Sequence, residues 1–428
     1  MEIENDFIWL EKHLACRGPY GLHRIEFLME RLENPQFDTP SVLIGGTNGK
    51  GSVTMILESI ATASGEYNIG STISPHLINF RERIRIQGEN LSEELWLEGI
   101  KQIKPHVKLM EREPSIGEPS FFELVIALFF WSLRETLRDL AFVEVGLGGK
   151  LDATNLIHPE ISVITNIGTD HKEFLGPDKP SIAIEKLGIV RKKGTLITSE
   201  KDPQILEIFR KDCSEKKANL ILSKPENYFS LLGSTPKNHL LKLPCATEPI
   251  RFSLPGMHQL ENLGLALSVI DKLRMNGFQI PDNAIVEGIE KVKWPGRLHW
   301  IEGNPPILLD GAHNQEGLQS LIDYLQKFPL PRPVHLILGV LSNKPVVNMA
   351  KHLSNFADTL SFVPPNTSRA ITEAEFNEQI KPLNPKWKWC PSLPMALEEG
   401  KNSATILLSG SLYLVADFLS IAPAEKPL

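Results

Sequence analysis

The sequence has 428 residues, of which 45 are basic and 52 acidic, so its formal net charge is −7. This acidic balance excludes a protein that binds nucleic acid through bulk positive charge. The length suggests two or three domains, and the four scattered cysteines form no CxxC pair, which excludes a zinc ribbon. The N-terminus is acidic, and the longest apolar stretch, residues 121–133, contains Glu123 and is too short to span a bilayer. We therefore expect a soluble cytoplasmic protein with no membrane or nucleic-acid partner.

Short apolar runs that end in glycine or polar residues recur along the chain and are typical of buried parallel strands. They cover residues 41–44, 140–145, 161–165, 307–309, 334–340 and 405–408. Helix-length segments lie between them, such as 53–64, which is followed by Gly65, and 262–273. The alternation predicts α/β layers that bind ligands at the carboxyl ends of their strands. Because this rhythm restarts at residue 307, we place a domain boundary between residues 293 and 294.

The strongest local signal is Gly-Gly-Thr-Asn-Gly-Lys-Gly-Ser at residues 45–52, between a predicted strand and a predicted helix. Glycines let backbone N–H groups close around phosphate oxygens, and Lys50 would reach the outer phosphates. The standard P-loop pattern fails by one position, because Gly51 separates Lys50 from Ser52. The alternative is a tight turn with a solvated lysine, but the flanking strand and helix favour a phosphate-binding loop.

A second glycine-rich segment begins at Glu144, late in the predicted strand 140–145. A carboxylate there suits Mg²⁺ beside a nucleotide phosphate, although an ion pair with a lysine explains it equally well. A dinucleotide fingerprint fails, since Leu151 stands where its third glycine should fall, and this disfavours an oxidoreductase.

Two polar pairs follow further along the chain. Asp170-His171 comes after the strand 161–165 and therefore lies at the presumed ligand edge, although a lone loop histidine is more often hydrogen-bonded than a ligand. Glu185-Lys186 lies in the segment 181–190, which looks helical. Composition alone predicts an exposed charge pair there.

Further motifs accompany these segments in a fixed order along nearly the whole chain. They are Ser74-Pro75-His76-Leu77, Arg81-x-Arg83-Ile84, His258-Gln259-x-x-Asn262, Trp294-Pro295-Gly296-Arg297-Leu298, Leu309-Asp310-Gly311-Ala312-His313-Asn314, Val363-Pro364-Pro365-Asn366 and Gly410-Ser411-Leu412-Tyr413. Together they closely resemble the folylpolyglutamate synthase and dihydrofolate synthase family of the Mur ligase superfamily. The resemblance implies an α/β fold with a P-loop-type parallel-sheet ATPase domain at 1–293. A smaller Rossmann-like glutamate-binding domain would follow at 294–428.

The resemblance also implies roles for the matching residues. The ATP site would comprise Thr47, Asn48, Gly49, Lys50, Gly51, Ser52, Asn262, Arg297 and Asp310. Two Mg²⁺ ions would be held by Ser74, Glu144, His171 and Lys186, the last after carbamylation, and K⁺ is a further candidate ion. Phe122, Asp152 and Ala153 would lie near the pterin, and His313 and Ser411 would handle glutamate. The candidate catalytic residues are Lys50, His171 and Lys186. Departures from the family pattern occur at Ile73, Lys150 and Lys172.

The implied activity is ATP-dependent ligation of L-glutamate to dihydropteroate, to a reduced folate or to both, through an acyl phosphate. A peptidoglycan-precursor ligase would usually carry a further N-terminal domain, whereas the phosphate loop here begins at residue 45. A P-loop binding protein without ligase activity would need no second domain with Arg297 and Asp310. We expect a monomer.

Overall fold

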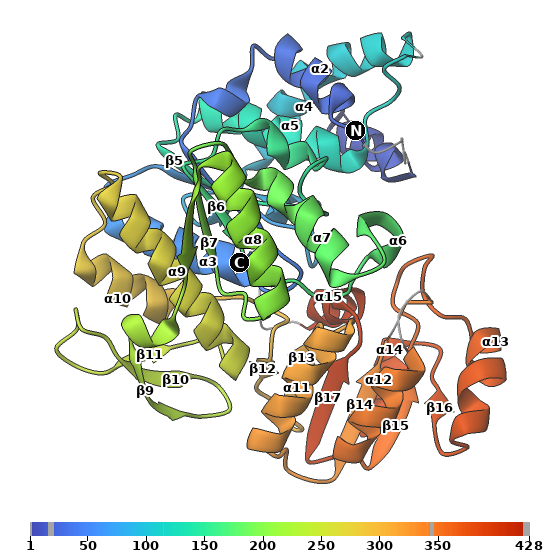
Figure 1. The fold of residues 1–428 in the computed structure, drawn as a ribbon. Helices are drawn as coiled ribbons and strands as arrows, with labels where there is room; N and C mark the ends of the chain where they lie inside the picture. Colours follow the sequence, from blue (N-terminus) through green and yellow to red (C-terminus); the bar gives the residue numbers. More distant parts are fainter. Residues whose placement is uncertain (1, 16–20, 114, 340, 343–345, 423–428) are drawn as a thin grey trace. The chain divides into compact units, whose positions relative to one another are not determined.

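The computed structural model describes residues 2–15, 21–113, 115–339, 341–342 and 346–422 (Figure 1). The chain forms two compact units, one made of Met1–Tyr228 and Glu261–Lys291 and the other of Phe229–Leu260 and Val292–Leu428. Every helix in the described ranges is too short or too polar to cross a membrane. The predicted division into residues 1–293 and 294–428, with an ATP-binding and a glutamate-binding role, stays a prediction.

The first unit is built on an eight-stranded sheet with the order β4-β3-β2-β5-β1-β6-β7-β8. Its strands are β1 Ser41–Gly45, β2 Ile69–Thr72, β3 Ile84–Ile86, β4 Glu89–Asn90, β5 Leu140–Glu144, β6 Ile161–Ile164, β7 Thr195–Thr198 and β8 Asn219–Leu222. In the spatial order from β2 to β8, each pair of neighbouring strands is parallel. Strand β3 pairs antiparallel with both β2 and β4. The carboxyl ends of β2, β5, β1 and β6 therefore meet at one edge.

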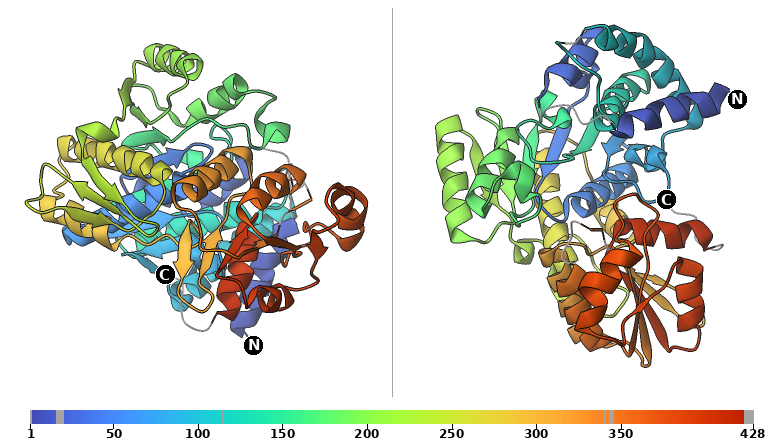
Figure 2. Two further views of the ribbon diagram at one scale, coloured as in Figure 1. Left: turned by 90° about the horizontal axis from the view of Figure 1, so that it is seen from below. Right: turned by 90° about the vertical axis from the view of Figure 1, so that its right-hand side faces the viewer.

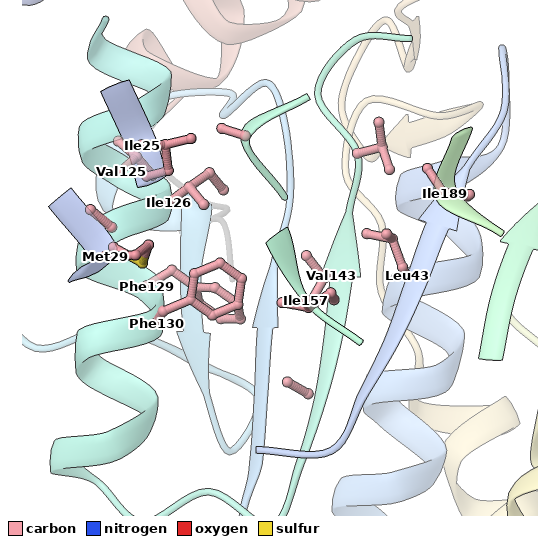
Figure 3. Packing of buried hydrophobic residues seen from close by; sticks show 14 of the residues in the cluster. Ile25, Met29, Leu43, Val125, Ile126, Phe129, Phe130, Val143, Ile157 and Ile189 are labelled. Atoms are coloured by element: carbon pink, nitrogen blue, oxygen red, sulfur yellow. The ribbon is translucent and has the colours of Figure 1, made fainter. Parts of the chain in front are cut away.

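Helices connect and cover these strands. They are α1 Glu2–Lys12, α2 His23–Arg31, α3 Lys50–Ser64, α4 Glu93–Glu111, α5 Phe121–Glu135, α6 Lys172–Leu175, α7 Lys179–Lys186, α8 Pro203–Lys216, α9 Met257–Met275 and α10 Asp282–Lys291. Short helical turns are η1 His13–Ala15, η2 Pro35–Phe37, η3 Phe80–Arg83, η4 Ala153–Leu156, η5 Leu187–Ile189 and η6 Pro225–Asn227. Figure 3 shows α2 and α5 side by side, with Met29 and Phe129 among the apolar side chains that pack toward Val143 on β5 and Leu43 on β1.

Helix α3, which follows the phosphate loop, packs against α10 as well as against the sheet. A Cβ added at Gly288 would lie 2.4 Å from Ile60 Cα, and Ser59 Oγ donates to the Gly288 carbonyl oxygen at 2.8 Å. Within the same helix, the buried Glu58 carboxylate accepts hydrogen bonds from Arg85 Nε on β3 and from Ser71 Oγ on β2. The helix that starts at the phosphate loop is thus packed against both a neighbouring helix and the sheet.

The second unit contains two sheets. A three-stranded antiparallel sheet has the order β11-β10-β9, with β9 Ser230–Ser234, β10 His239–Lys242 and β11 Ile250–Phe252. A six-stranded sheet has the order β12-β13-β17-β14-β15-β16, with β12 His299–Ile301, β13 Ile307–Asp310, β14 Val334–Leu338, β15 Thr359–Phe362, β16 Lys388–Trp389 and β17 Thr405–Ser409. Within the described residues of this larger sheet, β12 pairs antiparallel with β13, and the other neighbouring strands pair in parallel.

Helices flank the six-stranded sheet, as the orange and red ribbon in both views of Figure 2 shows. They are α11 Gln315–Lys327, α12 Val346–Leu353, α13 Glu373–Glu375, α14 Leu393–Gly400 and α15 Leu412–Ile421, with the turns η7 Ser354–Phe356, η8 Phe376–Ile380 and η9 Lys381–Leu383. Leu308, Leu336 and Leu407 lie on three neighbouring strands and are fully buried in the core of this sheet.

The predicted fold class is confirmed, and the six apolar runs all form parallel strands, except that residue 340 lies outside the described residues. The pattern missed the parallel strands β2, β7, β8, β15 and β16 and the antiparallel strands of the described residues. Strand β2 reads Ile-Gly-Ser-Thr and contains a single large apolar residue, yet all four residues are buried. The Ser71 hydroxyl is accommodated because it donates to Glu58, a tertiary contact that a hydropathy pattern does not reveal.

Candidate active site

The phosphate loop, residues 45–52, connects β1 to α3. Gly46 and Gly49 have φ angles of +134° and +87°, which favour glycine. A Cβ at Gly46 would lie 1.8 Å from Thr165 Oγ1, and one at Gly49 would lie 2.4 Å from Asn262 Oδ1. The glycines are therefore required both for the backbone conformation and for close packing. They bring the predicted nucleotide residue Asn262, on α9, directly against the loop.

The loop after β6 holds the phosphate loop through several hydrogen bonds. Thr47 N donates to Asn166 O at 2.9 Å, and Asn48 N donates to Asn166 Oδ1 at 3.1 Å. The Asn48 carbonyl accepts from Thr165 Oγ1 and from Asn166 Nδ2, and Thr47 Oγ1 accepts from Gly168 N. Sequence reasoning passed over Thr165 and Asn166, although their position at the end of the predicted strand 161–165 was a usable signal.

Lys50 and Lys186 converge on one carbonyl of the phosphate loop. Lys50 Nζ donates to Gly46 O and Thr47 O, each at 3.2 Å, and Lys186 Nζ donates to Gly46 O at 2.8 Å. Lys186 is only 4% exposed, so the prediction of an exposed charge pair was wrong for this residue. It shares its face of α7 with the buried Ile182, one turn earlier, which directs the lysine inward.

Burial changes the chemistry of the Lys186 amine. Removal from water lowers the pKa of Lys186 from 10.5 to about 7, and the nearby positive charge of Lys50 acts in the same direction. A large fraction of the amine is therefore uncharged near neutral pH and can act as a nucleophile.

Ser74 and Glu144 are brought together at the ends of neighbouring strands. Glu144 is the last residue of β5, is 4% exposed and pairs in register with Ile44 on β1. Ser74 follows the end of β2, and its backbone N–H donates to Glu144 Oε2 at 2.9 Å. A buried carboxylate beside a phosphate loop is stabilised by a cation.

His171 lies in the loop after β6, directly before α6 as its N-cap, with a φ angle of +57°. Its side chain is 43% exposed, and its Nε2 lies 3.8 Å from Asp170 Oδ2. Among the described residues, no three His, Cys, Asp or Glu side chains are grouped as for a metal. The predicted ligand set contains only two residues of these types, Glu144 and His171, so it stays a prediction.

The three residues predicted to lie near the pterin, Phe122, Asp152 and Ala153, are grouped at the loop after β5. A Cβ at Gly146 would lie 2.5 Å from the Phe122 ring, so the ring covers this glycine. Asp152 Oδ2 accepts from Leu147 N at 2.8 Å, and Oδ1 accepts from the backbone N–H and the hydroxyl of Thr154. Burial raises the pKa of Asp152, and both its oxygens are used to shape the loop.

Four predicted residues gather at the carboxyl edge of the six-stranded sheet, namely Arg297, Asp310, His313 and Ser411. Asp310 ends β13 and accepts from Leu298 N at 3.0 Å and from Ala312 N at 2.9 Å. Burial raises its pKa, and the Arg297 guanidinium opposes this shift. Asp310 thereby ties the segment before β12 to the turn after β13.

The turn after β13 carries His313, and the turn after β17 carries Ser411. A Cβ at Gly311 would lie 2.7 Å from Arg297 Nη1, and the Gly311 carbonyl is 2.8 Å from His313 Nδ1. Ser411 is 2% exposed and caps α15 by accepting from Tyr413 N at 3.0 Å. Within this unit the predicted residues thus share one edge of the sheet.

Two carboxylates that hold loops were missed by sequence reasoning. Glu200 follows β7, and its Oε2 accepts from Ile167 N at 2.7 Å, while Oε1 accepts from the backbone N–H groups of Lys201 and Asp202. Glu82, on η3, accepts from three backbone N–H groups of the loop after β2. Nothing in the pattern marked Glu82, and Glu200 was not marked either, because the strand before it, β7, was itself missed.

Two family models match the chain. The Mur ligase middle domain matches residues 122–270, and the Mur ligase glutamate ligase domain matches residues 296–412. The dihydrofolate synthase/folylpolyglutamate synthase of Bacillus subtilis is 33% identical over 419 residues, covering 96% of each chain. The protein of the same name from Escherichia coli is 30% identical and covers 95% of this chain and 92% of the relative.

Solved structures agree with these matches. Folylpolyglutamate synthase from Thermotoga maritima superposes with a TM-score of 0.84 and 29% identity, covering 98% of each chain. Mycobacterium tuberculosis folylpolyglutamate synthase complexed with ADP and AMPPCP gives a TM-score of 0.87 at 27% identity, covering 99% of this chain and 100% of that one. Escherichia coli FolC in complex with DHPP and ADP gives 0.83 at 28% identity, covering 98% and 97%.

Proposed function

The chain belongs to the dihydrofolate synthase/folylpolyglutamate synthase family of ATP-dependent ligases, and from this premise we propose that it joins L-glutamate to a pterin carboxylate through an acyl phosphate. The observation that carries the proposal is the shared strand edge of the phosphate loop and the buried Glu144, in a chain that matches this family over 96% of its length. The relatives' names combine both activities, and we propose both for this chain. A peptidoglycan-precursor ligase is disfavoured by the same matches.

The phosphate loop is proposed to bind the ATP triphosphate. Solved relatives are complexed with ADP and AMPPCP, which supports a nucleotide at the matching position. The backbone N–H groups at the start of α3 and the Lys50 ammonium would offset phosphate charge. Asn262 packs against Gly49 and is placed to contact the same nucleotide.

The donor set at this edge fits Mg²⁺ in part. The buried Glu144 carboxylate and the Ser74 hydroxyl offer the oxygen ligands that Mg²⁺ prefers, and His171 would add a nitrogen. An ammonium on Lys186 does not fit, but a carbamate would, because CO₂ joined to the neutral amine gives an anionic oxygen ligand and releases one proton. The pKa of about 7 supports that reaction. When bound, Mg²⁺ would neutralise charge on the phosphate oxygens. Two Mg²⁺ ions and K⁺ stay predictions.

The proposed chemistry has two steps. The pterin carboxylate attacks the γ-phosphorus of ATP, and ADP leaves while Lys50 offsets the charge on the transferring phosphate. The glutamate amine then attacks the acyl carbon, and phosphate leaves as the amide forms. Phe122, beside the loop after β5, offers an aromatic face on which a pterin ring can stack.

The roles of Arg297, Asp310, His313 and Ser411 toward nucleotide and glutamate stay predictions. So do the monomeric state and the cytoplasmic location.

A purified-enzyme assay tests the proposal. The protein is supplied with Mg-ATP and L-glutamate, and dihydropteroate and tetrahydrofolate are offered in separate reactions whose products are read by mass. We expect each acceptor to gain glutamyl residues with stoichiometric ADP release. ATP hydrolysis without an amide product would instead favour a P-loop protein that lacks ligase activity.

A further inference from the structure

The loop that follows β2 is folded around one carboxylate. Glu82 Oε2 accepts from Leu77 N at 2.6 Å, and Oε1 accepts from Ile78 N at 2.9 Å and from Asn79 N at 2.8 Å. Glu82 is 8% exposed. Three consecutive backbone N–H groups therefore share one buried anion, and hydrogen bonds to an ionised acceptor are stronger than those between neutral groups. Residues 74–79 are called the Ser74 loop below.

The short helix η3, which carries Glu82, is packed against the core. Phe80, on the same short helix η3, packs edge-on against Trp96 at a ring-centroid distance of 5.1 Å and against Phe121 at 6.5 Å. The Glu82 backbone N–H donates to Asn79 O at 3.0 Å, which closes the turn. Aromatic packing holds η3 independently of the Ser74 loop. The Glu82 carboxylate therefore holds the loop in place, and the loop is not what positions Glu82.

The Ser74 loop reaches two parts of the candidate active site. At its start, Ser74 N donates to Glu144 Oε2. In its middle, His76 Nδ1 accepts from Arg83 Nε at 2.8 Å, and the Arg83 guanidinium lies over the Phe121 ring at 5.3 Å. Phe121 begins the helix that also carries Phe122. A displacement of the loop would therefore alter the geometry at the end of β5 and at the start of α5 together.

We propose that Glu82 is a positioning residue for the ligation reaction, acting through the Ser74 loop without touching the substrates. This inference rests on the proposed function. A carboxylate is required because it presents two acceptor oxygens to three donors. Glutamine has nearly the same shape, but its NH₂ group would face a backbone N–H, so at least one loop amide would lose its acceptor.

Hydrogen exchange measured by mass spectrometry on peptides that cover residues 77–79 tests the loop directly, without relying on activity. We expect these amides to be protected in the wild-type protein and to exchange about tenfold faster in Glu82→Gln. Glu93→Gln is the matched control, because Glu93 is an exposed carboxylate that pairs with Arg81 at 3.1 Å in the same region. It should leave the exchange unchanged.

Steady-state kinetics then separate positioning from loss of folded protein. In Glu82→Gln, the KM for the pterin substrate should rise about tenfold, while the Kd of a non-hydrolysable ATP analogue stays within about twofold, since the phosphate loop is held by other contacts. Loss of folded protein alone would lower the apparent kcat and leave KM unchanged. Glu82→Asp keeps the anion on a shorter stem and should give an intermediate KM, and it serves as the test variant if Glu82→Gln does not fold.

Two outcomes would overturn the proposal. One is rapid exchange at residues 77–79 in the wild-type protein, and the other is wild-type exchange and KM in the folded Glu82 variants. If the wild-type protein forms no amide with either acceptor, the proposed function fails, but the exchange comparison still decides whether Glu82 holds the loop.

Discussion

The carboxyl edges of the two mainly parallel sheets are held together differently. In the first unit, separate carboxylates hold separate loops, with Glu82 on the loop after β2, Asp152 on the loop after β5 and Glu200 on the loop after β6. In the second unit, the carboxylate of Asp310 ties two segments together beside Arg297, and Asp417 on α15 accepts from Asn366 N in the loop after β15.

Because the two edges are held differently, we expect substitutions at the phosphate loop to affect activity and substitutions at Asp310 to affect the free energy of unfolding. The phosphate loop is supported by many contacts. Lys50 in the loop and Lys186 on α7, which donates to it, can therefore be changed without unfolding the protein. The buried Asp310 carboxylate ties two segments at once, so its loss should act on stability first. Four predictions follow this contrast, in order of decreasing effect.

Replacing Lys50 by alanine should lower the ligation rate about 1000-fold while the midpoint of thermal unfolding stays unchanged. The side chain is half-buried and bonds only to loop carbonyls, so it contributes to phosphate binding and not to the core. Product formation and calorimetry measure the two effects. Lys201→Ala, which removes an exposed lysine paired with Glu261, is the control and should retain full activity. Near-normal turnover in Lys50→Ala would remove the phosphate-loop assignment.

Replacing Lys186 by methionine should stabilise the unmodified protein in CO₂-depleted buffer by about 4 kcal/mol at pH 7. The folded-state pKa of Lys186 is about 7, below the ordinary 10.5, so between these pH values the unfolded chain binds more protons than the folded one. Wild-type stability should therefore rise with pH across this window, and the advantage of the variant should shrink to nothing near its upper end.

Urea unfolding at pH 7, 8, 9 and 10 measures this difference. Parallel pH profiles for Lys186→Met and wild type would contradict a charge cost at this position. The variant should also lose ligation activity, in keeping with the proposed role of Lys186.

Replacing Asp310 by alanine should lower the free energy of unfolding by about 2 kcal/mol, because Leu298 N and Ala312 N would remain buried without an acceptor. Glu200→Ala is the matched variant in the first unit and should cost less than about 1 kcal/mol, since Glu200 is only half-buried and water can replace its oxygens. Denaturant unfolding of both variants gives the comparison. Equal costs would erase the contrast between the two edges.

Replacing Gly46 by alanine should weaken binding of an ATP analogue about tenfold, because a Cβ would lie 1.8 Å from Thr165 Oγ1 at a φ of +134°. Gly65→Ala is the control, with a φ of +66° and nothing within 4 Å of the new Cβ. Isothermal titration of the two variants should show lost affinity in the first alone. Equal affinities would mean that the phosphate loop tolerates displacement from the loop after β6.

Much of this architecture could be predicted from the sequence. Several buried parallel strands appear in it as apolar runs, and the phosphate loop appears as glycines around Lys50. Strand β2 could not, since Ser71 is buried through a hydroxyl contact to Glu58 and not through hydropathy. The burial of Lys186 could not either, because composition does not say which face of α7 meets the phosphate loop. Glu82 was hidden for the same reason, since its three donors come together only in the folded loop.

The central claim, ligation through an acyl phosphate, is tested most directly by following one oxygen atom. Dihydropteroate labelled with oxygen-18 in its carboxylate is incubated with the enzyme, Mg-ATP and L-glutamate, and the released phosphate is analysed by mass. If the carboxylate attacks the γ-phosphorus, one labelled oxygen leaves with phosphate for each amide formed. Unlabelled phosphate accompanying amide formation would contradict the account.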